Sequence, residues 1–384
     1  MTDTRSRGTI LPVTNFNAEK VASRLRRAMR GIGTDEKVII DVLTSHSNVQ
    51  RQIIKKKYKV MYGTSLEEDI KAELGGHFED VCLALLTPVA EYIVECLHSA
   101  LKGYRADENC IIEILVSLEY MELRYIKAVF KEKYKHDLGE FLSSGLRGDI
   151  QKLVSALTDK DREYFAEVDH ELAVMEAHHL YDAGLSKSWG SDQDLFITVL
   201  ATRSREQLRA TIAAYEKISG HLMEEAIKSE FGGNIKHALL AIVECIDNRP
   251  AFFARQLHEA LNGPGTDDKT VIRILVSRSE IDLSDIQEWY HMKDFGSRFN
   301  RISWDLNTIK HGCMAVGIPP VTTESFFLRN ISQSTFPTKY IQHYPSNTIK
   351  KLSNTQNQKP PFRSSKFILN EGQCLTDLSG EQMA

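Results

Sequence analysis

The sequence lacks a long apolar run. Its longest uncharged apolar stretch covers residues 81–90 of a 384-residue chain. A helix that crosses a membrane needs ~20 such residues. The first residues also contain no apolar segment of signal-peptide length. We therefore expect a chain that is made in the cytosol and has no helix across a bilayer.

Cysteine is scarce, and neither sign of charge dominates. Six scattered cysteines without a C-x-x-C pair predict reduced, mostly buried thiols rather than a disulfide scaffold. The 48 basic and 52 acidic residues give a net charge of −4, which argues against nucleic-acid binding. An anionic partner would have to be bound locally or through a bridging cation. The apolar share of 42% is ordinary for a chain that buries a sizeable core.

Enzyme motifs are also missing. His258-Glu259 begins like a zinc-protease motif but lacks the second histidine, and the pair Gly31 and Gly33 lacks the third glycine of a dinucleotide loop. Neither a phosphate-binding G-x-x-x-x-G-K-[ST] nor a nucleophile elbow occurs. We predict that the protein is not an enzyme.

The chain repeats itself. Four similar segments begin at Val42, Ile114, Val199 and Ile274, with offsets of 72, 85 and 75 residues. A second set of similar segments has the same three offsets and begins at Tyr58, Phe130, Tyr215 and Tyr290. Two independent anchors with one spacing predict four copies of a unit of about 70 residues. The longer middle offset indicates an additional linker.

Each unit has a helical pattern. In the first unit, residues 18–30 place apolar side chains three and four positions apart on one face. Ser47 with Gln50 and Ser65 with Glu68 form capping-box patterns, and Thr34 is predicted to cap a helix that starts with acidic residues. No stretch shows the period of two that strands require. We predict an all-α fold with five short helices per unit, about twenty in total.

These patterns divide the chain. We expect a tail at 1–15, repeats at 16–87 and 88–158, a linker at 159–171, repeats at 172–246 and 247–318, and an extension at 319–384. The extension holds six of the ten prolines and carries seven basic against four acidic residues. Its polar composition predicts disorder. The extension is a candidate site for a protein partner or for direct lipid contact, and no motif decides between them.

The loop between the first two helices of a unit carries the most informative motif. Gly31 and Gly33 precede Thr34, and Gly263 and Gly265 precede Thr266. Glycines two apart allow left-handed backbone conformations that turn carbonyl oxygens outward. Carbonyl oxygens are hard ligands that suit Ca²⁺, which also needs a carboxylate here because it takes six to eight oxygens.

An acidic residue recurs forty positions after these loops. Glu73, Glu230 and Asp305 stand forty residues after Gly33, Gly190 and Gly265. In the second unit Arg105 replaces the glycine, and the residue forty positions on is Gly145. That unit has therefore lost both the glycine loop and the acid, and we predict no such Ca²⁺ site there.

Together the G-x-G-T loops, the distant acids and the four helical units resemble the annexin family, over about residues 15–318. The resemblance implies a curved disc of four five-helix domains with Ca²⁺ loops on its convex face. It also implies reversible, Ca²⁺-dependent binding to acidic phospholipid in membrane scaffolding, trafficking or repair, and self-association on membranes as an open option. The location implied is the cytoplasm, with peripheral membrane attachment when Ca²⁺ rises, and export without a leader stays open.

The resemblance also implies ligands. The first site would use the carbonyls of Met29, Gly31 and Gly33 with the Glu73 carboxylate. The fourth site would use Leu261, Gly263, Gly265 and Asp305. The third loop departs from the motif, so its expected ligands, Gly184, Lys187 or Ser188, Gly190 and Glu230, are less well defined.

Further residues are candidates for contacts outside the metal sites. Trp189 is either a packed side chain or an interfacial anchor in lipid, and Arg30 would face anionic headgroups. Glu113 and Arg273 occupy equivalent polar positions on apolar helices. They lie either on the surface or, by the resemblance, in a central polar channel where they could pair.

One alternative stays open at this point. A helical-repeat array could serve as a Ca²⁺-independent scaffold for other proteins. Carbonyl loops matched to distant acids have no purpose in such a scaffold, and Ca²⁺-dependent lipid binding would distinguish the two functions.

Overall fold

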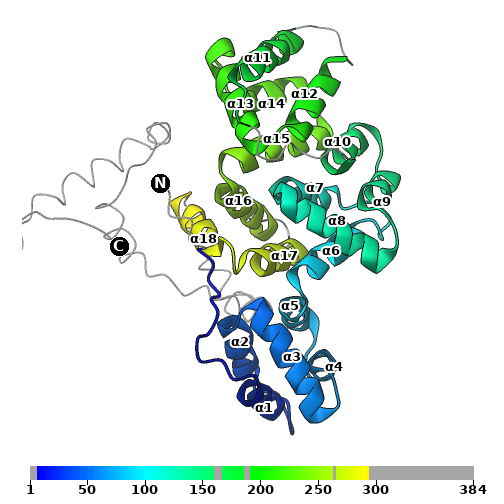
Figure 1. The fold of residues 1–384 in the computed structure, drawn as a ribbon, viewed down its shortest axis with the longest axis vertical. Coiled ribbons are helices and arrows are strands. Elements are labelled where there is room, and N and C mark those ends of the chain that lie inside the picture. The colour runs from blue at the N-terminus through cyan, green and yellow to red at the C-terminus, as the bar shows by residue number, and fades with distance from the viewer. Residues whose placement is uncertain (1–6, 160–166, 186–190, 263–264, 294–384) are drawn as a thin grey trace, which may run out of the picture. The chain divides into compact units, whose positions relative to one another are not determined.

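The computed structural model describes residues 7–159, 167–185, 191–262 and 265–293. These ranges hold eighteen α-helices and no strand, which confirms the all-α prediction (Figure 1). The expected fourth and fifth helices of the last unit, and the extension 319–384, lie outside the described residues.

The first three units each contain five helices. The first comprises α1 (Ala18–Ala28), α2 (Glu36–Ser45), α3 (Asn48–Tyr62), α4 (Leu66–Glu73) and α5 (Gly76–Leu86). The second comprises α6 (Val89–Ala100), α7 (Glu108–Ser117), α8 (Tyr120–Tyr134), α9 (Leu138–Gly145) and α10 (Gly148–Asp159). The third comprises α11 (His170–Leu185), α12 (Ser191–Thr202), α13 (Arg205–Ser219), α14 (Met223–Glu230) and α15 (Gly233–Asp247). The fourth contains α16 (Arg249–Asn262), α17 (Asp268–Arg278) and α18 (Leu283–Met292).

Local signals set the starts of α3 and α4 and the ends of α3, α8 and α13. The predicted capping boxes are present at Ser47 with Gln50 and at Ser65 with Glu68. Helices α3, α8 and α13 end at equivalent left-handed residues, with φ of 78° at Gly63, 62° at Lys135 and 73° at Gly220. Lys135 differs from the other two because it is not glycine. A residue with a Cβ in the left-handed conformation costs about 1–2 kcal/mol of stability.

Lys135→Gly should therefore stabilise the protein. Relief of the left-handed strain exceeds the entropy that glycine adds to the unfolded chain, so we expect a gain of about 0.5–1 kcal/mol. Urea unfolding measures it, and Gly63→Ala should lose stability by a similar amount. An unchanged or lowered midpoint for Lys135→Gly would show that the Lys135 side chain makes a compensating contact.

Two apolar cores hold the units together. The larger one draws on the second and third units and on all three described helices of the fourth. The smaller one fills the first unit and includes Ile272 and Val276 from α17. Helix α17 packs against both α5 and α6, so the fourth unit contacts the first and the second (Figure 1).

The N-terminal segment joins the first and fourth units. The backbone N–H groups of Thr9 and Ile10 both donate to the Ser279 carbonyl, at 2.7 and 3.0 Å. The Gln50 side chain exchanges two hydrogen bonds with the Val13 backbone. Gly8 packs so closely that an added Cβ would lie 2.5 Å from the Glu280 carbonyl carbon.

The described cysteines are free thiols. Cys82, Cys110 and Cys245 are buried and Cys96 is partly buried. Burial raises the pKa of the Cys82 thiol to about 12 and that of Cys96 to about 11, so neither is a reactive thiolate at neutral pH. Among the described helices, none combines the length and the apolar character needed to cross a membrane.

Candidate calcium loops and the polar centre

The first loop connects α1 to α2 in a closed turn. The N–H of Asp35 donates to the Ala28 carbonyl at 2.8 Å, which brings the ends of the loop together. Gly31 and Gly33 have φ of 117° and 86°, and a Cβ on either would meet no atom within 4 Å. Ile32, between them, is fully exposed. The glycine backbone therefore stands open to solvent in the conformation that the sequence predicted.

Thr34 does not cap α2, contrary to the prediction. Asp35 is the N-cap, and its side chain accepts from the N–H of Val38. Both residue types cap helices well, and Asp35 takes the position because its carbonyl accepts the first hydrogen bond of the helix, from the N–H of Ile39. Thr34 Oγ1 instead donates to Glu73 Oε2 at 2.8 Å. The hydrogen bond thus holds the carboxylate that ends α4 against the glycine loop, 39 residues away in sequence.

The oxygen atoms near this loop fit a calcium ion. Glu73 is exposed and forms no ion pair with a described cation, so its carboxylate is available. The last carbonyls of a helix have no partner within it, and Met29 is the C-cap of α1. No three His, Cys, Asp or Glu side chains converge in the described ranges, so a metal here would depend on carbonyls. The residues that would hold Ca²⁺ are Met29, Gly31, Gly33 and Glu73.

Only parts of the third and fourth candidate sites are described. Gly184 lies in the last turn of α11, where carbonyls are again unpaired, and Glu230 ends α14 partly exposed. Leu261 lies in the last turn of α16, and Gly265 is exposed with open space around it. The remaining predicted residues fall outside the described ranges: Lys187, Ser188, Trp189, Gly190, Gly263 and Asp305.

The second loop keeps the same closure but not the oxygen set. The N–H of Asp107 donates to the Ala100 carbonyl at 2.8 Å, as Asp35 does to Ala28 in the first unit. A Cβ on Gly145 would lie 2.7 Å from both terminal methyl carbons of Leu101. The space next to Gly145 is therefore occupied by the methyl groups of Leu101.

Comparison with known proteins agrees with this architecture. The annexin family model matches residues 20–85, 92–157, 176–242 and 252–296, more than half of the chain. The chain belongs to the annexin family. Mouse annexin A3 is 44% identical over 281 residues, which cover 73% of this chain and 87% of that protein.

Solved annexin structures share the fold. Annexin III superposes with a TM-score of 0.76 at 38% identity, covering 83% of this chain and 99% of that one. A calcium-bound annexin (Sm)1 superposes with a TM-score of 0.71 at 28% identity, covering 82% and 94%. Membership of the annexin family implies Ca²⁺-dependent binding to acidic phospholipid membranes, with peripheral attachment, and no enzymatic activity.

A carboxylate alone should not restore an annexin calcium site in the second unit. Gly145→Glu places the new Cβ against Leu101, whose partly exposed methyl groups can move aside, so we expect a cost of about 1 kcal/mol, at the low end for overpacking. We expect a lower urea midpoint and no additional bound Ca²⁺ by calorimetry. Combining Gly145→Glu with Leu101→Ala should recover much of the lost stability. Full stability of Gly145→Glu alone would contradict this steric contact with Leu101.

Polar contacts join the helix ends that flank the loops of neighbouring units. His77 lies at the start of α5, four residues after Glu73. Its Nε2 lies 3.1 Å from Oδ2 of Asp268, the first residue of α17. The Asn234 side chain, which follows Glu230, donates to Glu108 after the second loop. In the second unit, Nζ of Lys152 in α10 lies 2.8 Å from Oδ1 of Asp194 in α12 of the third unit. The start of α7, just after the second loop, thus lies beside the residues that follow Glu230 in the third unit.

Glu113 and Arg273 meet as a buried pair. Arg273 donates through Nε and Nη2 to the two Glu113 carboxylate oxygens at 2.8 and 2.7 Å, and both residues are 3% exposed. Burial alone would lower the pKa of Arg273, but the Glu113 charge and hydrogen bonds outweigh burial and raise it. The equivalent Asp41 is partly exposed and pairs with Arg24, and Thr198 is exposed. Glu113 and Arg273 therefore do not lie on the surface, and their position in a central polar channel stays a prediction.

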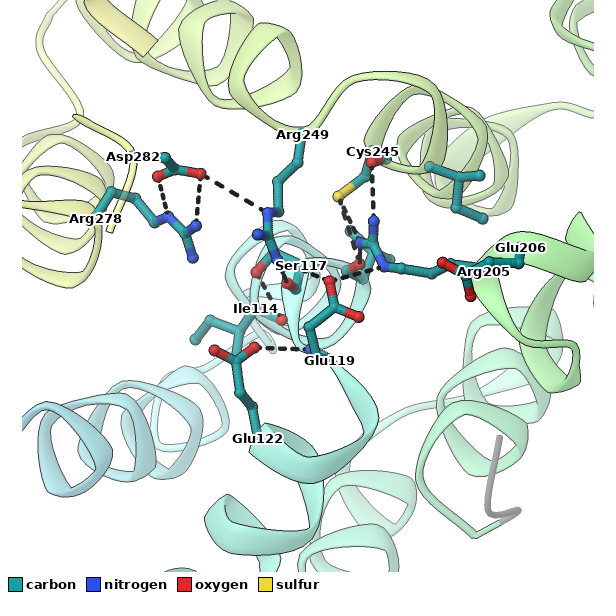
Figure 2. A network of polar contacts seen from close by, with 12 residues as sticks. Ile114, Ser117, Glu119, Glu122, Arg205, Glu206, Cys245, Arg249, Arg278 and Asp282 are labelled. Atoms are coloured by element: carbon teal, nitrogen blue, oxygen red, sulfur yellow. Dashed lines mark hydrogen bonds and ion pairs between the residues drawn. The ribbon is translucent and has the colours of Figure 1, made fainter. Parts of the chain in front are cut away.

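A second polar cluster joins three units and was not anticipated from the sequence (Figure 2). Glu119 Oε1 lies 3.0 Å from Arg249 Nη1 and 3.3 Å from Arg205 Nε. Arg249 also approaches Asp282, which accepts two hydrogen bonds from Arg278. A usable signal was present, because Glu119 stands where the other units have serine at 47, 204 and 279.

Proposed function

We propose that the first, third and fourth repeats bind Ca²⁺ through their loops and attach the protein reversibly to acidic phospholipid. The contact that supports this most is the hydrogen bond from Thr34 to Glu73, which holds a carboxylate beside an open glycine loop. In the same proposal the repeats span 16–87, 88–158, 172–246 and 247–318. The segments 1–15, 159–171 and 319–384 flank or connect them.

The charge of each site explains why lipid takes part. Glu73 offers one negative charge, so a divalent cation beside it would leave a positive site. When bound, Ca²⁺ would supply open coordination positions for phosphate or carboxylate oxygens of the headgroup. A site with one carboxylate is weak by itself, and three sites on one body gain about 10²–10⁴ in apparent affinity.

Residues beside the loops add direct lipid contact. Arg30 is exposed next to Gly31 and would face anionic headgroups. This contact would add about 1 kcal/mol to the free energy of membrane binding. Trp189 lies in the third loop of the sequence, and an indole ring suits the boundary between headgroups and acyl chains. In this proposal the protein is cytoplasmic and becomes peripheral on membranes when Ca²⁺ rises.

Calorimetric titration of Ca²⁺ tests the bridging function. Because binding linkage is reciprocal, phosphatidylserine vesicles should raise the Ca²⁺ affinity, by roughly tenfold or more. Phosphatidylcholine vesicles, which carry no net charge, serve as the control and should leave the affinity nearly unchanged. Equal Ca²⁺ affinity with and without phosphatidylserine would overturn the bridging proposal.

A further inference from the structure

The second loop has exchanged its calcium ligands for fixed positive charge. Gly145 replaces the acid, Arg105 replaces the second loop glycine, and Arg147 replaces the glycine that is Gly75 in the first unit and Gly232 in the third. Both arginines are exposed. Positive charge therefore stands permanently where the first unit would carry it only with Ca²⁺ bound.

We propose that this loop is a Ca²⁺-independent contact for an anionic phospholipid surface, formed by Lys102, Tyr104, Arg105 and Arg147. The inference rests on the proposed membrane function and adds to it a contact that needs no metal. In this proposal the second loop binds lipid and is not simply a calcium site that has lost its function.

The basic side chains are available for such a contact. Lys102, Arg105 and Arg147 are exposed, and none forms an ion pair with a carboxylate in the described part of the chain. The acids close to them in sequence keep their charge but have other partners, and within the described ranges none is paired with these three cations. The Asp107 carboxylate accepts from the N–H of Cys110, Glu108 accepts from Asn234, and Asp149 pairs with Lys152.

Tyr104 gives the loop an interfacial anchor. Its side chain is fully exposed at the loop tip, at the position of Ile32 in the first unit. The turn beneath it is tight, since a Cβ on Gly103 would lie 3.2 Å from the Arg105 carbonyl oxygen. A phenol ring flanked by cations suits the headgroup region, where aromatic rings concentrate.

The position of the loop supports a membrane over another anionic partner. Two contacts connect this region to the third unit: Glu108 with Asn234, four residues after Glu230, and Lys152 with Asp194 of α12. A membrane that is bound by the third repeat would therefore lie close to the basic loop of the second. The second loop would act with the third calcium site on one surface.

Vesicle binding with matched triple variants tests the inference. The test variant is Tyr104→Ala with Arg105→Gln and Arg147→Gln. The control variant, Tyr125→Ala with Lys56→Gln and Lys131→Gln, removes an exposed tyrosine and two exposed cations from helices α3 and α8. Each protein is titrated with phosphatidylserine–phosphatidylcholine vesicles in chelator at low salt, and again in saturating Ca²⁺.

We expect weak, salt-sensitive binding of the unmodified chain in chelator. Each lost cation is worth a factor of roughly five near an anionic surface, so the test variant should lose at least about tenfold in affinity in both arms. The control should stay within about twofold of the unmodified chain. Test and control variants with equal affinities in both arms would overturn the inference.

The two arms also separate this inference from the proposed function. If Ca²⁺ strengthens binding of all three proteins but the test variant matches the control, only the inference fails. If Ca²⁺ strengthens binding of none of them, the proposed calcium function fails, whatever the chelator arm shows.

Discussion

Glu73→Gln should weaken Ca²⁺-dependent binding to phosphatidylserine vesicles by roughly tenfold or more. The substitution keeps the shape and still allows the hydrogen bond from Thr34, but it removes the negative charge beside the first glycine loop. The half-maximal Ca²⁺ concentration for vesicle binding should rise, because one of three attachment points is lost. Binding in chelator should not change.

A carboxylate of similar exposure provides the control. Glu132 is an exposed residue of α8 and lies in no candidate loop, so Glu132→Gln changes the same charge without touching a proposed ligand. It should leave the Ca²⁺ requirement unchanged. Equal effects of the two substitutions would mean that overall charge, rather than Glu73 itself, controls binding.

Arg273→Met should cost about 3–5 kcal/mol of unfolding free energy. It leaves the Glu113 carboxylate, which is 3% exposed, without its bidentate partner. A buried uncompensated charge is far more costly than a missing surface pair. The measurement is urea unfolding followed by circular dichroism at neutral pH.

An exposed ion pair in the first unit supplies the comparison. Arg24 and Asp41 lie 3.2 Å apart with nearly half of each side chain exposed, so Arg24→Met should cost no more than about 1 kcal/mol. The double variant Glu113→Gln, Arg273→Met removes both charges and should be clearly more stable than Arg273→Met alone. If single and double variants were equally unstable, shape rather than charge would explain the loss.

The repeat architecture could be predicted from the sequence because its signals are local and recur. Two sets of four similar segments with common offsets predicted the units, and the capping boxes at Ser47 and Ser65 formed as their residue types require. The first glycine loop was predicted in the same way, and Gly31 and Gly33 have the positive φ values that glycine adopts readily, whereas Gly265 in the fourth loop does not. The separation of forty residues paired Glu73 with its loop.

What escaped prediction depends on contacts between distant segments. Thr34 and Asp35 are both good caps, so only the fold shows that Thr34 instead contacts Glu73. The contact of Leu101 with Gly145 follows from packing, which no local pattern reports. Glu119 meets Arg249 across 130 positions of sequence, where helical periodicity carries no information.

Cosedimentation with vesicles tests the central claim most directly. The full chain is mixed with phosphatidylserine–phosphatidylcholine or pure phosphatidylcholine vesicles at physiological salt, with Ca²⁺ or with chelator. If Ca²⁺ bridges the loops and the lipid, strong pelleting is expected only with both phosphatidylserine and Ca²⁺, and the protein should be released when chelator is added. Pelleting of equal strength in chelator, or none in any condition, would contradict a calcium bridge between these loops and the membrane.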